Sequence, residues 1–469
     1  MNTATFTSDS VNAPSTTKGD LIRWFEDLTN ADVPIAGGKN ASLGEMIRTL
    51  KSESIAVPDG FAITAHAYRE YIKHNDLGEA ITQHMADLEA GRRSLSDAGR
   101  LVRRMIQDGE IPERLRADIE SAYDALGKRY GVEKADVAVR SSATAEDLPD
   151  ASFAGQQESF LNIVGVKELC YTCQRCFASL FTDRAISYRQ QRGFDHMSVA
   201  LSIGVQKMVR SDKGSSGVMF TLDTETGFPD VIVINAAYGL GETVVQGMVT
   251  PDEYRIFTPL LEKSDKAPIV EKVLGTKLIK MIYGDGWIKR TQTVNTNFEE
   301  RGKFVLTDEQ ILKLARSGSV IARHYGRPMD IEWAVDGLSE EMFIVQARPE
   351  TVRSRQVLSS MVTSKLMKTK EKPSVVVQGQ AIGRTIRAGK VAILRGMQDA
   401  KNFAEGQILV ASSTDPDWVP LMKMAAGIIT DHGGRTSHAA IVSRELGIPA
   451  IIGTGDATHR LYPSEEVTI

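Results

Sequence analysis

Residues 430–444 read Thr-Asp-His-Gly-Gly-Arg-Thr-Ser-His-Ala-Ala-Ile-Val-Ser-Arg. The apolar run at 427–430 predicts a short buried strand. Gly433 and Gly434 then permit a tight turn, and apolar residues continue at helical spacing to about Leu446. A strand, a turn and a helix in this order predict an α/β domain.

His438 lies in the first turn of that predicted helix, because Thr436 or Ser437 can serve as the N-cap. A neutral imidazole nitrogen can attack a phosphoryl group, and the N–H groups of a helix N-terminus stabilise the charge of the resulting phosphohistidine. Arg435 adds a fixed positive charge nearby. A lone histidine at a helix end is more often structural, so these residues alone make His438 a candidate only.

The composition of the chain is that of an ordinary globular protein. It has 469 residues, 42% of them hydrophobic and 25% charged, with a formal net charge of -4. This charge gives no overall reason to bind nucleic acid or an anionic membrane, and no run approaches the roughly 20 apolar residues of a membrane span. We expect a cytoplasmic protein with more than one domain.

The chain divides where its composition changes. Residues 391–394 and 407–411 are further short apolar runs, and Asp415-Pro416 is typical of a helix start. A stretch rich in Ser, Lys and Thr precedes them and indicates a linker. We predict a disordered tail at 1–20, a larger mixed α/β (α+β) unit at 21–352, a linker at 353–378 and a small α/β domain at 379–469.

Three cysteines, Cys170, Cys173 and Cys176, have a spacing that also occurs in iron–sulfur and zinc sites. Their apolar neighbours recur at helical intervals, and the sequence has no fourth cysteine. We therefore predict buried thiols on one face of a helix.

Two segments alternate polar and apolar residues, Asp330-Ile331-Glu332-Trp333-Ala334-Val335 and Phe343-Ile344-Val345-Gln346-Ala347-Arg348. In strands, this period of two places Asp330 and Glu332 on one face, and Gln346 and Arg348 on one face of the other. If the strands form a hairpin, carboxylate, amide oxygen and guanidinium groups meet on one side. This combination suits Mg2+ and nucleotide phosphates, although a solvated polar face with one ion pair is the simpler alternative.

Two basic residues are placed where they could also reach phosphates. Lys39 follows two glycines at the start of a predicted helix. Arg140 ends a predicted strand, and a loop of small and hydroxyl residues follows it through 141–157. Each pattern alone is weak, because both also occur at ordinary surface loops.

Taken together, residues 433–442 and 139–157 resemble the phosphoenolpyruvate-utilising enzymes, and in particular the phosphoenolpyruvate synthases. The resemblance implies an ATP-grasp domain followed by a swivelling phosphohistidine domain, with His438 as the phosphocarrier. It implies ATP contacts from Lys39, Arg140, Gly155, Gln206, Met208, Glu332, Gln346 and Arg348. It further implies Glu332 and Gln346 as Mg2+ ligands and Thr436 as a site for a regulatory kinase and phosphorylase.

The reaction implied by the resemblance converts ATP, pyruvate and water to AMP, phosphoenolpyruvate and phosphate. The family binds pyruvate in a further C-terminal barrel, so we expect a truncated chain that performs only the self-phosphorylation half. We also expect a homo-oligomer. Ser437 stands where the synthases often have Cys, which leaves pyruvate, phosphate dikinase and rifampin-type antibiotic phosphotransferase as alternatives. A non-catalytic nucleotide-binding fragment is an alternative of another class.

Overall fold

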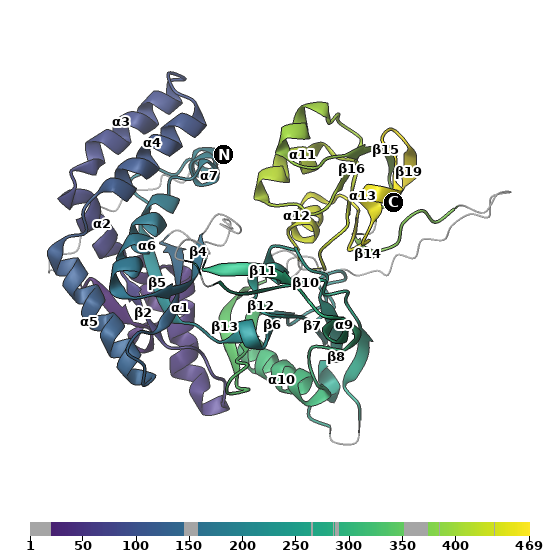
Figure 1. Cartoon of the computed structure of the whole chain (residues 1–469), viewed down its shortest axis with the longest axis horizontal. Coiled ribbons are helices and arrows are strands. Elements are labelled where there is room, and N and C mark those ends of the chain that lie inside the picture. The colour runs from purple at the N-terminus through teal and green to yellow at the C-terminus, as the bar shows by residue number, and fades with distance from the viewer. Residues whose placement is uncertain are drawn as a thin grey trace, which may run out of the picture.

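A computed structural model describes residues 20–144, 158–263, 266–284, 286, 290–350, 374–383, 385–435 and 437–469. Two predicted site residues, Gly155 and Thr436, lie outside the described residues, as do the predicted tail up to residue 19 and most of the predicted linker. The remaining chain forms three larger sheets and a separate hairpin (Figure 1). No helix in these ranges is long and apolar enough to cross a membrane.

The first sheet has five antiparallel strands in the order β1-β2-β5-β3-β4. The strands are β1 (Ile22–Trp24), β2 (Gly60–Ile63), β3 (Asp136–Ala143), β4 (Ser159–Val164) and β5 (Leu201–Lys207). The helices that follow β2 and β4 are α2 (Ala65–His74), α3 (Leu77–Glu89), α4 (Leu95–Asp108), α5 (Glu113–Arg129), α6 (Val166–Ser179) and α7 (Asp183–Arg192). Buried residues of the sheet and these helices form one continuous hydrophobic core.

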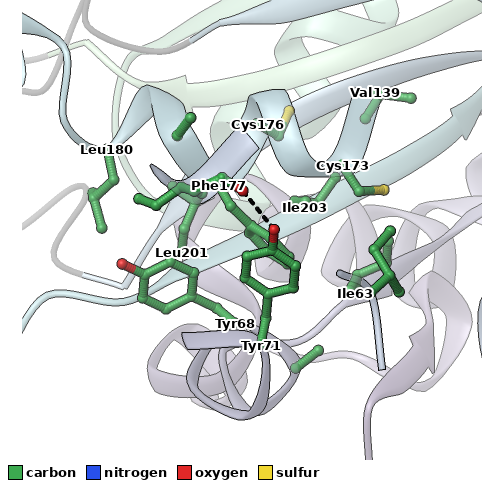
Figure 2. Packing of buried hydrophobic residues seen from close by; sticks show 14 of the residues in the cluster. Ile63, Tyr68, Tyr71, Val139, Cys173, Cys176, Phe177, Leu180, Leu201 and Ile203 are labelled. Atoms are coloured by element: carbon green, nitrogen blue, oxygen red, sulfur yellow. Dashed lines mark hydrogen bonds between the residues drawn. The ribbon is translucent and has the colours of Figure 1, made fainter. Parts of the chain in front are cut away.

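The three cysteines are part of this core, as the helical spacing predicted. All three are buried free thiols on α6, and Figure 2 shows Cys173 and Cys176 on that helix beside Phe177. The Phe177 ring contacts Tyr68 and Tyr71 of α2 at centroid distances of 5.4 and 5.3 Å. Burial raises the pKa of the Cys173 and Cys176 thiols, so these groups stay protonated and unreactive.

The second sheet has six antiparallel strands in the order β13-β12-β6-β7-β8-β9. They are β6 (Ser215–Phe220), β7 (Val231–Tyr238), β8 (Asp252–Phe257), β9 (Ile269–Val273), β12 (Met329–Val335) and β13 (Met342–Pro349). Helix α10 (Asp308–Tyr325) packs on it, and α1 (Val33–Leu50) contacts β13 as well as β3 and β5 of the first sheet. Two short helices, α8 (Glu242–Val245) and α9 (Phe298–Gly302), and the hairpin β10 (Ile279–Tyr283) and β11 (Thr291–Asn295) complete this unit.

The third sheet, also six-stranded, is made entirely from the C-terminal segment, in the order β14-β18-β17-β16-β15-β19. Its strands are β14 (Gln380–Ile382), β15 (Ala388–Ile393), β16 (Ile408–Ala411), β17 (Gly427–Thr430), β18 (Ala450–Ile452) and β19 (Glu466–Thr468). The four central strands are parallel, and both edge strands are antiparallel to their neighbours. Helices α11 (Val419–Met424), α12 (His438–Leu446) and α13 (Ala457–Arg460) connect them.

Local predictions for this sheet are confirmed. The apolar runs are β15, β16 and β17, and Ser437 is the N-cap of α12, accepting a hydrogen bond from the Ala440 N–H at 3.4 Å. Gly447 ends α12 in the left-handed region, with φ +68°. The Asp415 side chain likewise caps a short 3-10 turn ahead of α11.

One local prediction is wrong. The expected loop after Arg140 does not start there, because β3 continues to Ala143. Ser141 and Ser142 pair with Ile203 and Ser202 of β5. Small hydroxyl residues have weak strand preference alone, but the neighbouring strand supplies the backbone hydrogen bonds that extend β3.

Candidate nucleotide and phosphohistidine site

The predicted hairpin is β12 and β13, and its register matches the alternation at 330–332 and 346–348. An irregularity between Glu332 and Trp333 shifts the remainder, so that Ile344, and not the expected Val345, faces the core opposite Trp333. Asp330 lies opposite Arg348, and Glu332 lies opposite Gln346. The intervening apolar residues Ile331 and Trp333 are buried in the core of the second sheet. The polar groups therefore share the face that turns away from this core.

Arg348 is held in place by its partner across the hairpin. Its Nε and Nη2 lie 2.9 and 2.8 Å from Oδ2 of Asp330. Burial raises the pKa of Asp330, and the Arg348 charge opposes that rise. Asp330 thus fixes the direction of a guanidinium group that suits phosphate recognition.

Arg140 on β3 faces Glu332 on β12, which brings the first and second sheets together at this point. Its Nη2 lies 3.7 Å from Oε2 of Glu332, and its side chain is 17% exposed. Its Nε and Nη1 are buried without a hydrogen-bond partner in the described part of the chain. Leaving buried charged N–H groups unpaired is costly, so this arrangement points to an anionic ligand.

Glu242, at the start of α8, is a further member of the same cluster. Burial raises the pKa of Glu242. The charge of Arg140 opposes this rise and the charge of Glu332 adds to it, so both charged groups lie near the Glu242 carboxyl. Its position in the Gly239-Leu240-Gly241-Glu242 tract after β7 was the available sequence indication.

Lys39 lies close to the same edge of β3. Helix α1 is interrupted at Gly37, where φ is +73° and ψ is +163°, and helical geometry resumes immediately before Lys39. A Cβ atom at Gly37 would lie 2.5 Å from the backbone oxygen of Ser142, so only glycine permits this approach. The contact places the start of the second helical segment against the strand that carries Arg140.

Gln206 is the penultimate residue of β5, and Met208 follows the last residue of that strand. The buried Gln206 amide donates to the Pro58 oxygen at 3.3 Å, so it is engaged within the protein. Met208 is buried in a small apolar cluster with Ala138, Leu240 and Met281. Of the two, the Met208 cluster is the surface that suits an apolar ring.

His438 is the first residue of α12 and is fixed through one of its ring nitrogens. Nδ1 lies 3.1 Å from the Thr414 hydroxyl, and no described residue hydrogen-bonds Nε2. Burial lowers the pKa of His438 to about 4, with Asp415 opposing and Arg184 adding to the shift. The imidazole is therefore neutral near pH 7, and Nε2 is the ring nitrogen without a hydrogen bond from the described residues. Thr414 was missed by the sequence analysis, although it directly precedes the predicted helix cap at Asp415.

The N-terminus of α12 rests on the segment that follows β7. A Cβ atom at Gly247, just after α8, would lie 2.5 Å from the Ser437 Cβ, and one at Gly434 would lie 3.0 Å from Pro251. Arg184 of α7 pairs with Asp417 at 3.7 Å. The segment 242–247 thus joins the Arg140 cluster at one end to the His438 helix at the other.

Glu332 and Gln346 could supply two oxygen ligands to a metal ion, beside a guanidinium with unpaired N–H groups. Within the described ranges, no group of three or more His, Cys, Asp or Glu side chains could hold a metal ion. Mg2+ commonly binds through one or two protein oxygens together with substrate phosphates. The donor set therefore fits Mg2+ delivered with a nucleotide.

Comparison with known proteins gives two matching family models. Residues 33–369 match the pyruvate phosphate dikinase AMP/ATP-binding domain, and residues 403–469 match the PEP-utilising enzyme mobile domain. Among curated relatives, phosphoenolpyruvate synthase of Aquifex aeolicus is 52% identical, with 96% of this chain and 53% of the relative covered. The synthases of Synechocystis and Escherichia coli are 50% and 46% identical, each with 96% of this chain and 56% of the relative covered.

The chain spans about half the length of the curated relatives it matches. Its first family model covers most of the first two sheets, and its second covers most of the third. The chain belongs to the pyruvate phosphate dikinase AMP/ATP-binding domain family and carries a PEP-utilising mobile domain after it.

Proposed function

We propose that this chain transfers the β-phosphoryl group of ATP to Nε2 of His438, as the first half of a phosphoenolpyruvate synthase reaction. The observation that carries the proposal is the contact of Ser437 with Gly247, five residues after Glu242 of the Arg140 cluster. A neutral histidine at a helix N-terminus therefore docks beside a cluster with unpaired guanidinium N–H groups.

The side chains have distinct roles in this proposal. Arg140, Lys39 and Arg348 bind phosphate oxygens, and the Met208 cluster packs against the base. Glu332 and Gln346 would hold Mg2+, which would neutralise phosphate charge. Gln206 acts through the β5 backbone, since its amide is engaged with Pro58. Gly155, in the sequence segment 141–157, contributes a further phosphate contact.

The histidine step forms a bond from Nε2 to the β-phosphorus, and the bond to the AMP oxygen breaks. AMP leaves, and His438 at first carries both the β- and γ-phosphoryl groups. Water then attacks the γ-phosphorus and the β–γ bridging bond breaks, so that phosphate leaves and His438 retains the β-phosphoryl group. In this proposal the Nδ1–H group donates to the Thr414 hydroxyl oxygen, which leaves the lone pair on Nε2 for the attack. The N–H groups of α12 then stabilise the phosphohistidine charge.

The second half of the reaction is transfer from phospho-His438 to pyruvate. The names of the relatives support this acceptor. Regulation at Thr436, a cytoplasmic location and a homo-oligomeric assembly remain predictions that accompany this function.

The test is incubation of the chain with Mg2+ and ATP labelled at the β-phosphate. We expect label on the wild-type chain, none on His438→Ala, and full label on His459→Ala, a control on an exposed histidine of the same unit. Equal labelling of His438→Ala and wild type would refute the assignment of the phosphocarrier.

The same assay separates the alternatives. Formation of pyrophosphate that depends on added phosphate would identify a pyruvate, phosphate dikinase. ATP turnover that requires added rifampin would identify an antibiotic phosphotransferase. Tight ATP binding without AMP formation would identify a non-catalytic nucleotide-binding unit.

A further inference from the structure

A short turn between β6 and β7 presents Glu225 to the third sheet. The Asp223 N–H donates to the Phe228 oxygen at 2.9 Å, and the Gly227 N–H donates to the Asp223 oxygen at 2.7 Å. The Glu225 N–H donates to Oδ1 of Asp223 at 2.8 Å. These bonds close the turn on itself, so Glu225 extends from a rigid support.

The Glu225 carboxylate contacts three segments of the C-terminal unit. Its Oε1 accepts from Nε of Arg444 at 2.8 Å, also pairs with Nη2 of that residue, and lies 3.7 Å from Nη1 of Arg435. Its Oε2 accepts from the Gly383 N–H at 3.3 Å. The Arg444 side chain is 4% exposed and that of Glu225 is 14%, so this pair is shielded from solvent far more than a surface ion pair.

A second carboxylate supports the same contact. Oε2 of Glu253 lies 3.3 Å from Nε of Arg435. Arg255 holds the acidic side in place, pairing with Asp223 at 3.2 Å and with Glu253 at 3.2 Å. Contacts with Arg255 thus hold Asp223 and Glu253 in place without any contribution from the third sheet and its helices.

The two arginines flank His438 along the chain. Arg435 lies in the turn that leads to α12, and Arg444 lies near the end of that helix. A carboxylate that binds both of them fixes the orientation of α12 as well as its position. Contact at one end alone would leave the helix free to rotate about that end.

We propose that Glu225 is a positioning residue for phosphorylation of His438, docking α12 on the nucleotide unit through Arg435 and Arg444. The proposal rests on the proposed function, because it assigns the geometry of the same transfer. Since these ion pairs join two units, they must break before His438 can reach an acceptor elsewhere. Their strength therefore sets how long His438 stays at the donor site.

The first measurement is the rate of His438 labelling from β-labelled ATP. Loss of one partner of a buried charge pair predicts a rate about 30-fold lower for Glu225→Gln. KM for ATP should not change, because Glu225 is outside the Arg140 cluster. Glu262→Gln, on an exposed glutamate of the same unit, is the matched control and should keep the wild-type rate.

A charge exchange separates positioning from simple loss of folding. Glu225→Arg should lower the labelling rate further, because it repels Arg444, and Arg444→Glu added to Glu225→Arg should recover part of it. An exchange variant that is folded yet no faster than Glu225→Arg would contradict the proposal.

The second measurement does not depend on catalysis. Spin labels at Glu309→Cys and Lys401→Cys, two exposed positions in the two units, report their separation, and the native thiols are buried. We expect one narrow distance distribution with Glu225 present and a broader one in Glu225→Gln. An unchanged distance distribution in Glu225→Gln would overturn the docking role. If the wild-type chain took up no phosphoryl label from ATP, that result would instead count against the proposed function.

Discussion

Two charged groups in the unit formed by the first two sheets differ in whether their buried N–H groups are hydrogen-bonded. Lys277 is fully buried, and its Nζ lies 2.5 Å from Oδ1 of Asp252 and 2.9 Å from the Gly275 oxygen. Arg140 buries Nε and Nη1 without a hydrogen-bond partner among the described residues. The hydrogen bonds of Lys277 make it part of the fold, whereas we expect a bound ligand to complete the unmade bonds of Arg140.

The surroundings of the two groups extend the contrast. Asp252 also accepts from the backbone N–H groups of Gly275 and Val305 and from the Tyr254 hydroxyl. The partner of Arg140, Glu332, is 31% exposed and 3.7 Å away. Stability and ligand binding should therefore respond in opposite ways to removal of the two charges.

The largest effect is expected from Lys277→Met. It leaves the Asp252 carboxylate buried without its cation, which should lower the free energy of unfolding by about 3–5 kcal/mol. Urea denaturation measures this loss. Molecules that remain folded should bind ATP with unchanged affinity.

The matched control is Lys303→Met, since Lys303 pairs with Glu299 at the surface, with side chains 65% and 74% exposed. It should leave the free energy of unfolding nearly unchanged, because solvent screens this pair. Equal costs for the two lysine variants would remove the distinction between a structural and a surface pair.

The second effect is expected from Arg140→Met, and it concerns activity. Loss of one preorganised charged donor should slow His438 labelling by about 100- to 1,000-fold. The free energy of unfolding should change by less than about 1 kcal/mol, because the lost ion pair is long and two unpaired N–H groups disappear with it.

Arg104→Met, on a side chain of α4 that is 76% exposed, controls for loss of a positive charge in general. An Arg140 variant that labels normally but unfolds easily would place Arg140 with Lys277, as a structural residue.

Whether a feature of the site could be predicted from the sequence depends on how far apart in the chain the contacting residues lie. Alternation predicted which side chains share a face at 330–332 and 346–348, and the hairpin register agrees there. The irregularity after Glu332, which turns Ile344 to the core, was not predicted. The capping of α12 was equally local and was predicted correctly. The extension of β3 to Ala143 was not, because the pairing with β5 that causes it joins distant segments.

The residues that sequence reasoning missed all act across distant segments. Glu225 meets Arg444 across 219 positions of sequence, and Thr414 meets His438 across 24 positions. Asp252 and Lys277 show no periodic pattern that would pair them. Patterns of two or 3.6 residues report faces of single elements, and they carry no information on which faces meet.

The His438 ring has one hydrogen-bonded nitrogen and one without a described partner. Removing the partner of the first is expected to have the smallest effect on the labelling rate. Nδ1 has its partner in Thr414, whereas no described residue hydrogen-bonds Nε2. Thr414→Val removes the hydroxyl but keeps the shape, and loss of a single hydrogen bond should slow labelling by about five- to tenfold. Thr414→Ser keeps the hydroxyl and should restore most of the rate. If valine and serine variants label equally, the hydroxyl does not orient the ring, and the choice of Nε2 must come from packing around α12 alone.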